Sequence, residues 1–134
     1  MYLLDTNVVS ELRRPRPHGA VLAWLNSVGD DRLHVAAVTL FELQAGAEIT
    51  RRQDTVRAFE LDAWIDSIPE QFRIEVVDER VYRLAARLLH GKSVDLYEDG
   101  VIAATALVHN LTVVTRNIRD FAHFNVPTFD PFKN

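Results

Sequence analysis

The sequence opens with "MYLLDTNVVSEL" (residues 1–12), in which an apolar run leads directly to Asp5 and then to an amphipathic stretch. The run before Asp5 has the composition of a short buried strand, and the residues after it have the spacing of a helix. A buried carboxylate is costly unless another group compensates its charge. The position of Asp5 therefore predicts either a cap for the following helix or a ligand site at the end of a strand.

The composition is that of an ordinary globular domain. Of the 134 residues, 48% are hydrophobic and 25% are charged, so we expect a single domain over residues 1–134 with a core of its own. The chain has no cysteine, which excludes disulfides and thiolate metal sites and fits a reducing cytoplasm. No basic leader precedes residue 5, and the longest nearly apolar run, residues 101–108, is too short for a membrane span.

The charge balance also limits the function. The net charge is −4, from 15 basic and 19 acidic side chains. This balance argues against a protein that coats itself in nucleic acid, because such proteins need a broad basic surface. It does not exclude a nucleic-acid enzyme that gathers its acidic groups at one metal ion, since bound cations reverse the local charge.

Strand-like and helix-like segments alternate along the chain. Strands are predicted over residues 1–5, 33–38, 72–77 and 111–115, with a fifth candidate at 126–130. The helices predicted between them cover residues 7–14, 20–28, 39–49, 55–68, 79–90 and 100–110. We expect prolines to end the first and fourth of these helices and Gly91 to close the fifth. The alternation predicts an α/β fold with a central parallel sheet flanked by helices on both faces.

Three more acidic residues occupy places like that of Asp5. Glu42 follows the second predicted strand, Asp99 begins the helix at residue 100, and Asp120 follows the fourth strand. Each also has a purely structural interpretation. Thr39 and Glu42 match a capping box, Asp99 suits the positive end of a helix dipole, and Asp120 fits a cap or a turn.

Taken together, the four acidic residues favour a metal site. A parallel sheet brings the carboxyl ends of its strands to one edge, where these carboxylates would repel one another and raise each other's pKa values. Mg²⁺ or Mn²⁺ would neutralise such a cluster, because these ions prefer carboxylate and water oxygens. The small residues after Asp99 let its helix pack closely and hold that carboxylate in place; they are Gly100, Ala103, Ala104 and Ala106.

The segments that carry these four acidic residues resemble the motifs of a known family. Four segments resemble the acidic motifs of the PIN domain, most closely those of VapC toxins of bacterial toxin–antitoxin pairs and their FitB-like relatives: "LLDTNVVSEL" (3–12), "TLFELQAG" (39–46), "DGVIAATA" (99–106) and "TVVTRNIRDF" (112–121). The resemblance runs from about residue 2 to residue 132. It implies a PIN-like fold and a Mg²⁺- or Mn²⁺-dependent endoribonuclease in which a metal-activated water cleaves RNA.

The resemblance also assigns roles to residues. It makes Asp5 and Asp99 the main metal ligands. It completes the catalytic set with two residues that act directly or through water, Glu42 and Asp120. The supporting polar residues that it places around the site are Thr6, Thr115 and Asn117.

The resemblance further implies partners. They are an RNA substrate and a cognate VapB-type antitoxin, with a homodimer and a toxin–antitoxin hetero-oligomer as the expected assemblies. One departure from the family pattern is Glu98, which stands where a neutral residue is expected and adds charge beside Asp99.

Basic and aromatic residues provide secondary candidates. Arginines that follow the acidic motifs are candidates for phosphate contacts: Arg13, Arg14, Arg16, Arg51, Arg52, Arg116 and Arg119. Trp24 and Trp64 occupy apolar helix positions and are expected in the core, with a partner surface as the alternative for Trp64. The five histidines lack zinc-site spacing, and most are expected at the surface or at helix ends.

Rival interpretations fit the sequence less well. The segment after Asp5 lacks the second aspartate of the haloacid-dehalogenase motif, and the phosphoacceptor and late lysine of a receiver domain are not visible. The stronger rival is a catalytically silent PIN-fold module that acts through protein partners. The full acidic set favours catalysis, because an idle site has no reason to keep carboxylates that repel one another.

Overall fold

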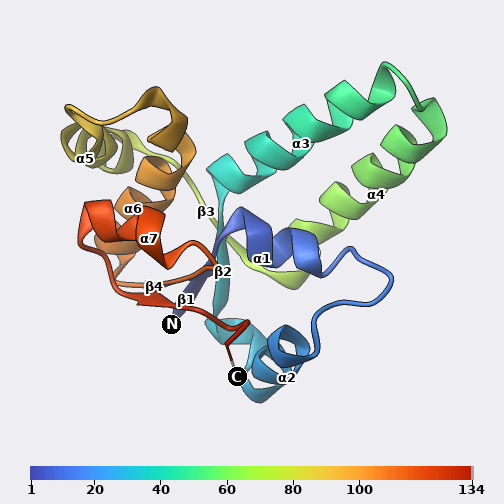
Figure 1. Cartoon of the computed structure of the whole chain (residues 1–134), viewed down its shortest axis with the longest axis horizontal. Helices are drawn as coiled ribbons and strands as arrows, with labels where there is room; N and C mark the ends of the chain where they lie inside the picture. Colours follow the sequence, from blue (N-terminus) through green and yellow to red (C-terminus); the bar gives the residue numbers. More distant parts are fainter. Residues whose placement is uncertain (134) are drawn as a thin grey trace.

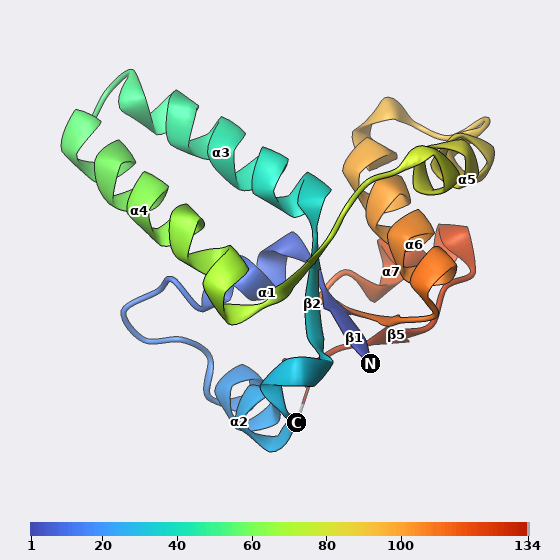
Figure 2. The ribbon, with the colours of Figure 1, turned by 180° about the vertical axis from the view of Figure 1, so that it is seen from behind.

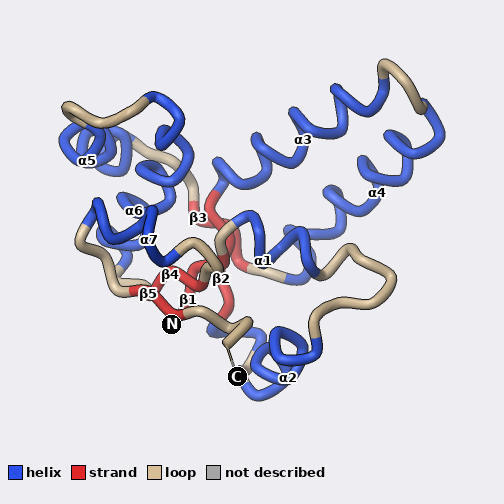
Figure 3. Tube along the Cα trace, viewed as in Figure 1, coloured by secondary structure: helices blue, strands red, loops and turns tan. Residues whose placement is uncertain are grey.

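The sheet has five parallel strands in the order β3-β2-β1-β4-β5 (Figures 1 and 3). The structure is a computed structural model that describes residues 1–133. The strands are β1 (Tyr2–Leu4), β2 (Leu33–Ala36), β3 (Arg73–Glu75), β4 (Thr112–Val114) and β5 (Thr128–Phe129). All neighbouring strands pair in parallel, and Leu3 lies opposite both His34 and Val113. The predicted parallel sheet and its fifth strand are confirmed.

Helices cover both faces of this sheet. They are α1 (Thr6–Glu11), α2 (Gly19–Ser27), α3 (Ala37–Arg51), α4 (Thr55–Gln71), α5 (Glu79–Leu89), α6 (Tyr97–His109) and α7 (Ile118–Phe121). Short 3₁₀ turns lie at Asp30–Arg32, Val94–Leu96 and Ala122–Phe124. Figures 1 and 2 show α5, α6 and α7 on one side of the sheet and α1 and α2 on the other, with α3 and α4 projecting as a long hairpin. None of the helices within residues 1–133 is long and apolar enough to cross a membrane.

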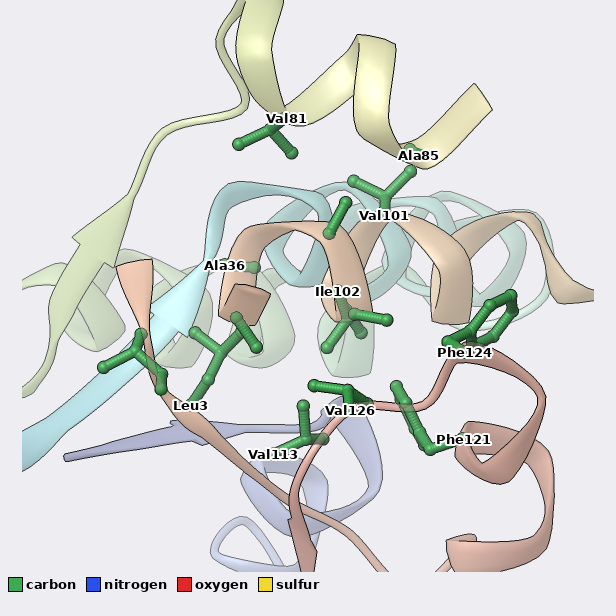
Figure 4. Packing of buried hydrophobic residues seen from close by; sticks show 14 of the residues in the cluster. Leu3, Ala36, Val81, Ala85, Val101, Ile102, Val113, Phe121, Phe124 and Val126 are labelled. Carbon is green, nitrogen blue, oxygen red and sulfur yellow. The ribbon is translucent and has the colours of Figure 1, made fainter. Parts of the chain in front are cut away.

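The core on the α6 side fixes the helix that carries Asp99. Val101 and Ile102 are fully buried against residues of β1, β4 and α5 (Figure 4). The small residues of α6 behave as predicted, because Ala103, Ala104 and Ala106 are also fully buried in this cluster. A second cluster on the other face joins β1 and β2 to α1, α2 and α4, and half-buried Trp24 and Trp64 pack against it.

Gly100 provides a test of this packing. An ideal Cβ at Gly100 would lie 2.5 Å from Cγ of Leu89 on α5, so the whole Leu89 side chain would have to move. We expect Gly100→Ala to lower the free energy of unfolding by about 1–3 kcal/mol in denaturant titrations. The control is Gly46→Ala in α3, where nothing lies within 4 Å and alanine should stabilise the helix by about 0.5–1 kcal/mol. Equal effects of the two changes would contradict the close approach.

Helix α3 begins earlier than predicted. Its N-cap is Ala36, which makes no side-chain capping bond, so the predicted capping box of Thr39 and Glu42 is wrong. Within the apolar run over residues 33–38, residues 33–36 form the strand β2 and residues 37–38 begin α3. Composition alone does not mark the boundary between the two, and Thr39 is left fully buried inside the helix.

Other boundaries also differ from the prediction, and α1 ends at Glu11, before the predicted residue 14 and before Pro15. Helix α4 continues through Pro69 to Gln71. A proline near the last turn removes only one backbone hydrogen bond, and the next helical bond, from Phe72 N–H to Ile68 O at 3.0 Å, still forms. Helix α6 begins at Tyr97, so Asp99 lies within the first turn and not before it. The predicted end of α5 is confirmed, with Gly91 at φ +77° just beyond the helix.

Candidate active site

A cavity of about 440 Å³ opens at the carboxyl edge of the sheet, where β1 leads into α1. The chain pairs β1 with β2 on one side and with β4 on the other, so the cavity lies near the switch in strand order. Ligand sites of α/β sheets form at such points. The cavity contains five of the predicted site residues: Asp5, Thr6, Glu42, Asp99 and Asn117.

Asp5 is both a helix cap and a wall of the cavity. Its side chain is 4% exposed, and its Oδ1 accepts the backbone N–H of Thr6 at 2.8 Å. Its Oδ2 accepts the hydroxyl of Thr115 at 2.7 Å and the side-chain amide of Asn7 at 3.1 Å. Burial raises the pKa of Asp5 despite these donors, and the charge of Asp120 raises it further. The cap interpretation is therefore confirmed, and Asp5 also lines the cavity, while its role as a ligand stays a prediction.

Glu42 is fixed by a hydroxyl from another helix. Thr6 at the start of α1 donates its hydroxyl hydrogen to Glu42 Oε1 at 2.7 Å, and its oxygen lies 3.1 Å from the hydroxyl of Thr39. Burial raises the pKa of Glu42, and the charges of Asp5 and Glu98 act in the same direction. The pair of threonines thus connects α1 to α3 and holds the Glu42 carboxylate at the cavity.

Asp99 has the most perturbed carboxyl group of the cavity. Burial, followed by the charges of Asp5, Asp120 and Glu42, raises its pKa to about 7. No hydrogen bond within residues 1–133 counters these effects. The charge of Glu98 raises the pKa of Asp99 by a smaller amount. Glu98, the residue that departs from the family pattern, therefore adds to the negative charge of the site. A carboxylate in this situation gains most from a nearby cation.

Asp120 and Thr115 do not line the cavity, but both act on residues that do. Asp120 lies in the short helix α7 and is not part of the cavity wall, but its charge reaches both Asp5 and Asp99. Thr115 is fully buried behind Asp5 and accepts the backbone N–H of Asn117 at 2.9 Å. Thr115 therefore positions Asp5 and Asn117 without facing the cavity.

Three polar residues of α1 line the cavity but were not predicted as site residues: Asn7, Ser10 and Glu11. Their spacing of three and four residues places them on one face of the helix, and this polar stripe is visible in the sequence. Asn7 holds Asp5 and also accepts the backbone N–H of Arg116 at 3.3 Å. Glu11 is 6% exposed and accepts the backbone N–H of His18 at 2.9 Å, which secures the loop after α1.

Only some of the candidate arginines reach this cavity. Arg13, Arg14 and Arg116 line it, so three cationic side chains share the cavity with the carboxylates. Arg51 is engaged elsewhere, because its guanidinium binds Glu48 and Asp62 at 2.9 Å and 2.8 Å between α3 and α4. The cavity wall does not include Arg16, Arg52 or Arg119.

The histidines take no part in this cavity. His34 is an exception to the expectation of surface or helix-end positions, because it is 5% exposed in β2. Its Nδ1 lies 2.8 Å from Glu75 Oε1 in β3, and His109 Nε2 lies 3.5 Å from Glu75 Oε2. This pairing joins strands distant in the sequence, so spacing along the chain could not indicate it.

The donor chemistry of the cavity suits a magnesium-like ion. Asp5, Glu42 and Asp99 offer carboxylate oxygens in one cavity, although within residues 1–133 no group of three or more acidic or histidine side chains is placed to hold a metal ion together. Mg²⁺ keeps several of its waters and binds proteins through one or two carboxylates, so it needs no such cage. The assignment of Asp5 and Asp99 as ligands stays a prediction.

Comparison with known proteins agrees with this fold. Residues 2–126 match the PIN domain family, and the chain belongs to that family. Among individual relatives, it is 38% identical to Toxin FitB of Neisseria gonorrhoeae, over 98% of this chain and 99% of that one. It is 31% identical to VapC ribonuclease Y4jK of Sinorhizobium fredii, over 99% of each chain. The crystal structure of FitAcB from Neisseria gonorrhoeae superposes with a TM-score of 0.85, at 37% identity over 100% of both chains. The predicted family and fold are confirmed.

Proposed function

We propose that this protein is a metal-dependent endoribonuclease, the toxin of a toxin–antitoxin pair, and that Asp5, Glu42, Asp99 and Asp120 form its catalytic site. The observation that carries the proposal is the convergence of Asp5, Glu42 and Asp99 on one cavity at the switch point of the sheet. Curated relatives over nearly the whole chain are named a toxin and a VapC ribonuclease. The whole chain acts as a single domain in this proposal.

The proposed chemistry is hydrolysis of an RNA phosphodiester. Mg²⁺ or Mn²⁺ held by Asp5 and Asp99 would lower the pKa of a water molecule and neutralise charge on the phosphate. In this proposal Glu42, held by Thr6, orients the attacking water and accepts its proton, and its raised pKa makes it a better base than an exposed glutamate. Asp120, which does not line the cavity, acts through its charge and through water in this proposal.

Neighbouring residues keep this arrangement rigid. Thr115 and Asn7 both donate to Oδ2 of the Asp5 carboxylate, and both are fixed by backbone groups of the segment after β4. The arginines that line the cavity supply the positive charge that positions a phosphate: Arg13, Arg14 and Arg116. Such preorganised charges are most effective where little water surrounds them.

The same relatives indicate the partners. A toxin requires a cognate inhibitor, which we propose to be a VapB-type antitoxin, and the active assembly is a homodimer that the antitoxin converts to a hetero-oligomer. Action on cellular RNA places the protein in the cytoplasm in this proposal, in keeping with a chain that has no cysteine.

Metal removal tests the proposal. We expect the purified protein to cleave single-stranded RNA with Mg²⁺ or Mn²⁺, to lose this activity in EDTA, and to regain it when the metal is restored in excess. The matched control is the same titration with Ca²⁺, which prefers more ligands and longer bonds and should restore much less activity. Cleavage products are followed on denaturing gels.

The main alternative predicts a different result. A catalytically silent PIN-fold module would bind partners and leave RNA intact under every metal condition. RNA cleavage that continues undiminished in EDTA would contradict the proposed metal site. The raised pKa of Asp99 favours catalysis over the silent module, because a structural carboxylate has no need of four acidic neighbours.

A further inference from the structure

A second cavity adjoins the acidic one and has the opposite charge. It has a volume of about 570 Å³ and is here called the Trp64 groove; its lining residues are Arg13, Arg14, Pro15, Arg57, Glu60, Leu61 and Trp64. Arg13 and Arg14 line both cavities, so the groove continues directly from the candidate active site. Three arginines face one glutamate in the groove, although the chain as a whole is acidic.

The groove combines these cations with an indole ring. Trp64 is half-buried in α4, and the guanidinium carbon of Arg13 lies 5.9 Å from the centre of its ring. That distance is near the outer limit of a cation–π contact, so the contact holds Arg13 only weakly and leaves it free to turn toward a phosphate. Arg57 is exposed on α4, and Arg14 is 3.7 Å from Glu11 of the acidic cavity.

We propose that the Trp64 groove binds the single-stranded RNA segment next to the cleaved phosphodiester, with one base stacked on Trp64 and the flanking phosphates on the arginines. This inference rests on the proposed nuclease function and extends it to the path of the substrate. Proteins bind single-stranded nucleic acid through this combination of cationic groove and aromatic platform.

Charge and position favour RNA over a protein occupant. An RNA strand that places a phosphate in the acidic cavity must leave it through a neighbouring surface, and Arg13 and Arg14 form the shared wall. Each phosphate of that strand brings one negative charge to a groove whose cations outnumber its single glutamate. The competing occupant is a bound antitoxin peptide, and quenching of tryptophan fluorescence distinguishes it from RNA.

Tryptophan fluorescence measures occupancy of the groove without cleavage. The chain has two tryptophans, and Trp24 is packed against Tyr2 and Phe129 with ring centres 5.0 Å and 5.3 Å away. In EDTA, a short mixed-sequence oligoribonucleotide should quench the Trp24→Phe protein, in which Trp64 is the only reporter. The same oligonucleotide should leave the Trp64→Phe protein unquenched, and Trp64→Leu should weaken RNA binding about 10-fold.

Salt dependence tests the arginines of the groove. Arg57→Gln should weaken binding and reduce the slope of log K against log salt by about 0.7, the value for one phosphate contact with a single strand. The matched control is Arg83→Gln, which removes the same charge from an exposed position on α5, on the other side of the sheet (Figure 1). Arg83→Gln should leave the slope unchanged.

The outcomes separate this inference from the proposed function. Quenching of Trp64→Phe equal to that of Trp24→Phe, or equal slopes for the two arginine variants, would overturn the RNA groove. Quenching of Trp64 by purified antitoxin but not by RNA would also overturn it and would assign the groove to protein docking. Because quenching needs no cleavage, an inactive wild-type protein that still shows the expected quenching would contradict only the nuclease proposal.

Discussion

Replacement of Asp99 by asparagine should lower the rate of RNA cleavage by roughly 10³-fold while the protein stays folded. The asparagine would keep the size of the side chain and remove the charge that, with Asp5, is proposed to hold the metal. Among the proposed ligands Asp99 gives the cleaner test, because the Asp5 carboxylate also caps α1 and accepts the Thr115 hydroxyl. Single-turnover cleavage with saturating Mn²⁺ measures the effect.

A neighbouring aspartate provides the matched control. Asp95 is exposed in the 3₁₀ turn just before α6 and does not line the cavity, so Asp95→Asn makes the same chemical change outside the site. We expect its cleavage rate to stay within about twofold of the wild type, since it makes none of the proposed catalytic contacts. If Asp99→Asn cleaves RNA as fast as Asp95→Asn does, Asp99 is not a metal ligand and the proposed site is wrong.

The general plan of the fold follows from local patterns in the sequence. Alternating apolar strands and amphipathic helices predict the parallel sheet, and the positions of Asp5 and Glu42 after predicted strands predict the edge where the cavity lies. The carboxyl ends of parallel strands must meet at one edge, so few alternatives remain once the strands are known. Asp99 could be placed there because small residues mark its helix as tightly packed.

The details that sequence analysis missed depend on contacts between distant segments. The capping box at Thr39 fails because the helix starts at Ala37, where Val38 is buried against the core. The hydroxyl of Thr6 then finds Glu42 across 36 positions, which no local pattern reveals. The buried pairing of His34 with Glu75 likewise depends on the order of the strands.

Asp120 shows a further limit of sequence analysis. The motif places it beside Thr115 and Asn117, but the residue lies in the short helix α7 and does not line the cavity. Its influence on Asp5 and Asp99 is through charge alone in the structure. Helices of one turn are set by packing and not by propensity, so their direction is the least predictable part of such a site.

The metal-free protein should lose stability as the pH rises from about 4 to about 7. The pKa of Asp99 is raised from 3.8 to about 7 by burial and by its acidic neighbours, so the folded protein keeps a proton that the unfolded chain has released. Stability falls with pH wherever the folded state binds more protons. The lowered pKa values of Glu48, Asp62 and Asp78 have the opposite sign, but their effect is complete by about pH 5. The groups with raised pKa values, Asp99 together with Asp5 and Glu42, therefore decide the upper part of this window.

The expected loss is roughly 1–3 kcal/mol across this window, with allowance for the partial exposure of the carboxyl group. Denaturant titrations in EDTA at several pH values measure it, with Asp99→Asn as the comparison, because both proteins share every other titrating group. Asp99→Asn should be the more stable protein at about pH 8 in EDTA, and excess Mg²⁺ should stabilise the wild type far more than the variant, since the cation binds the folded state. Parallel pH profiles for the two proteins, or an equal response of both to Mg²⁺, would show that the repulsion at Asp99 is not relieved by a cation bound at this site.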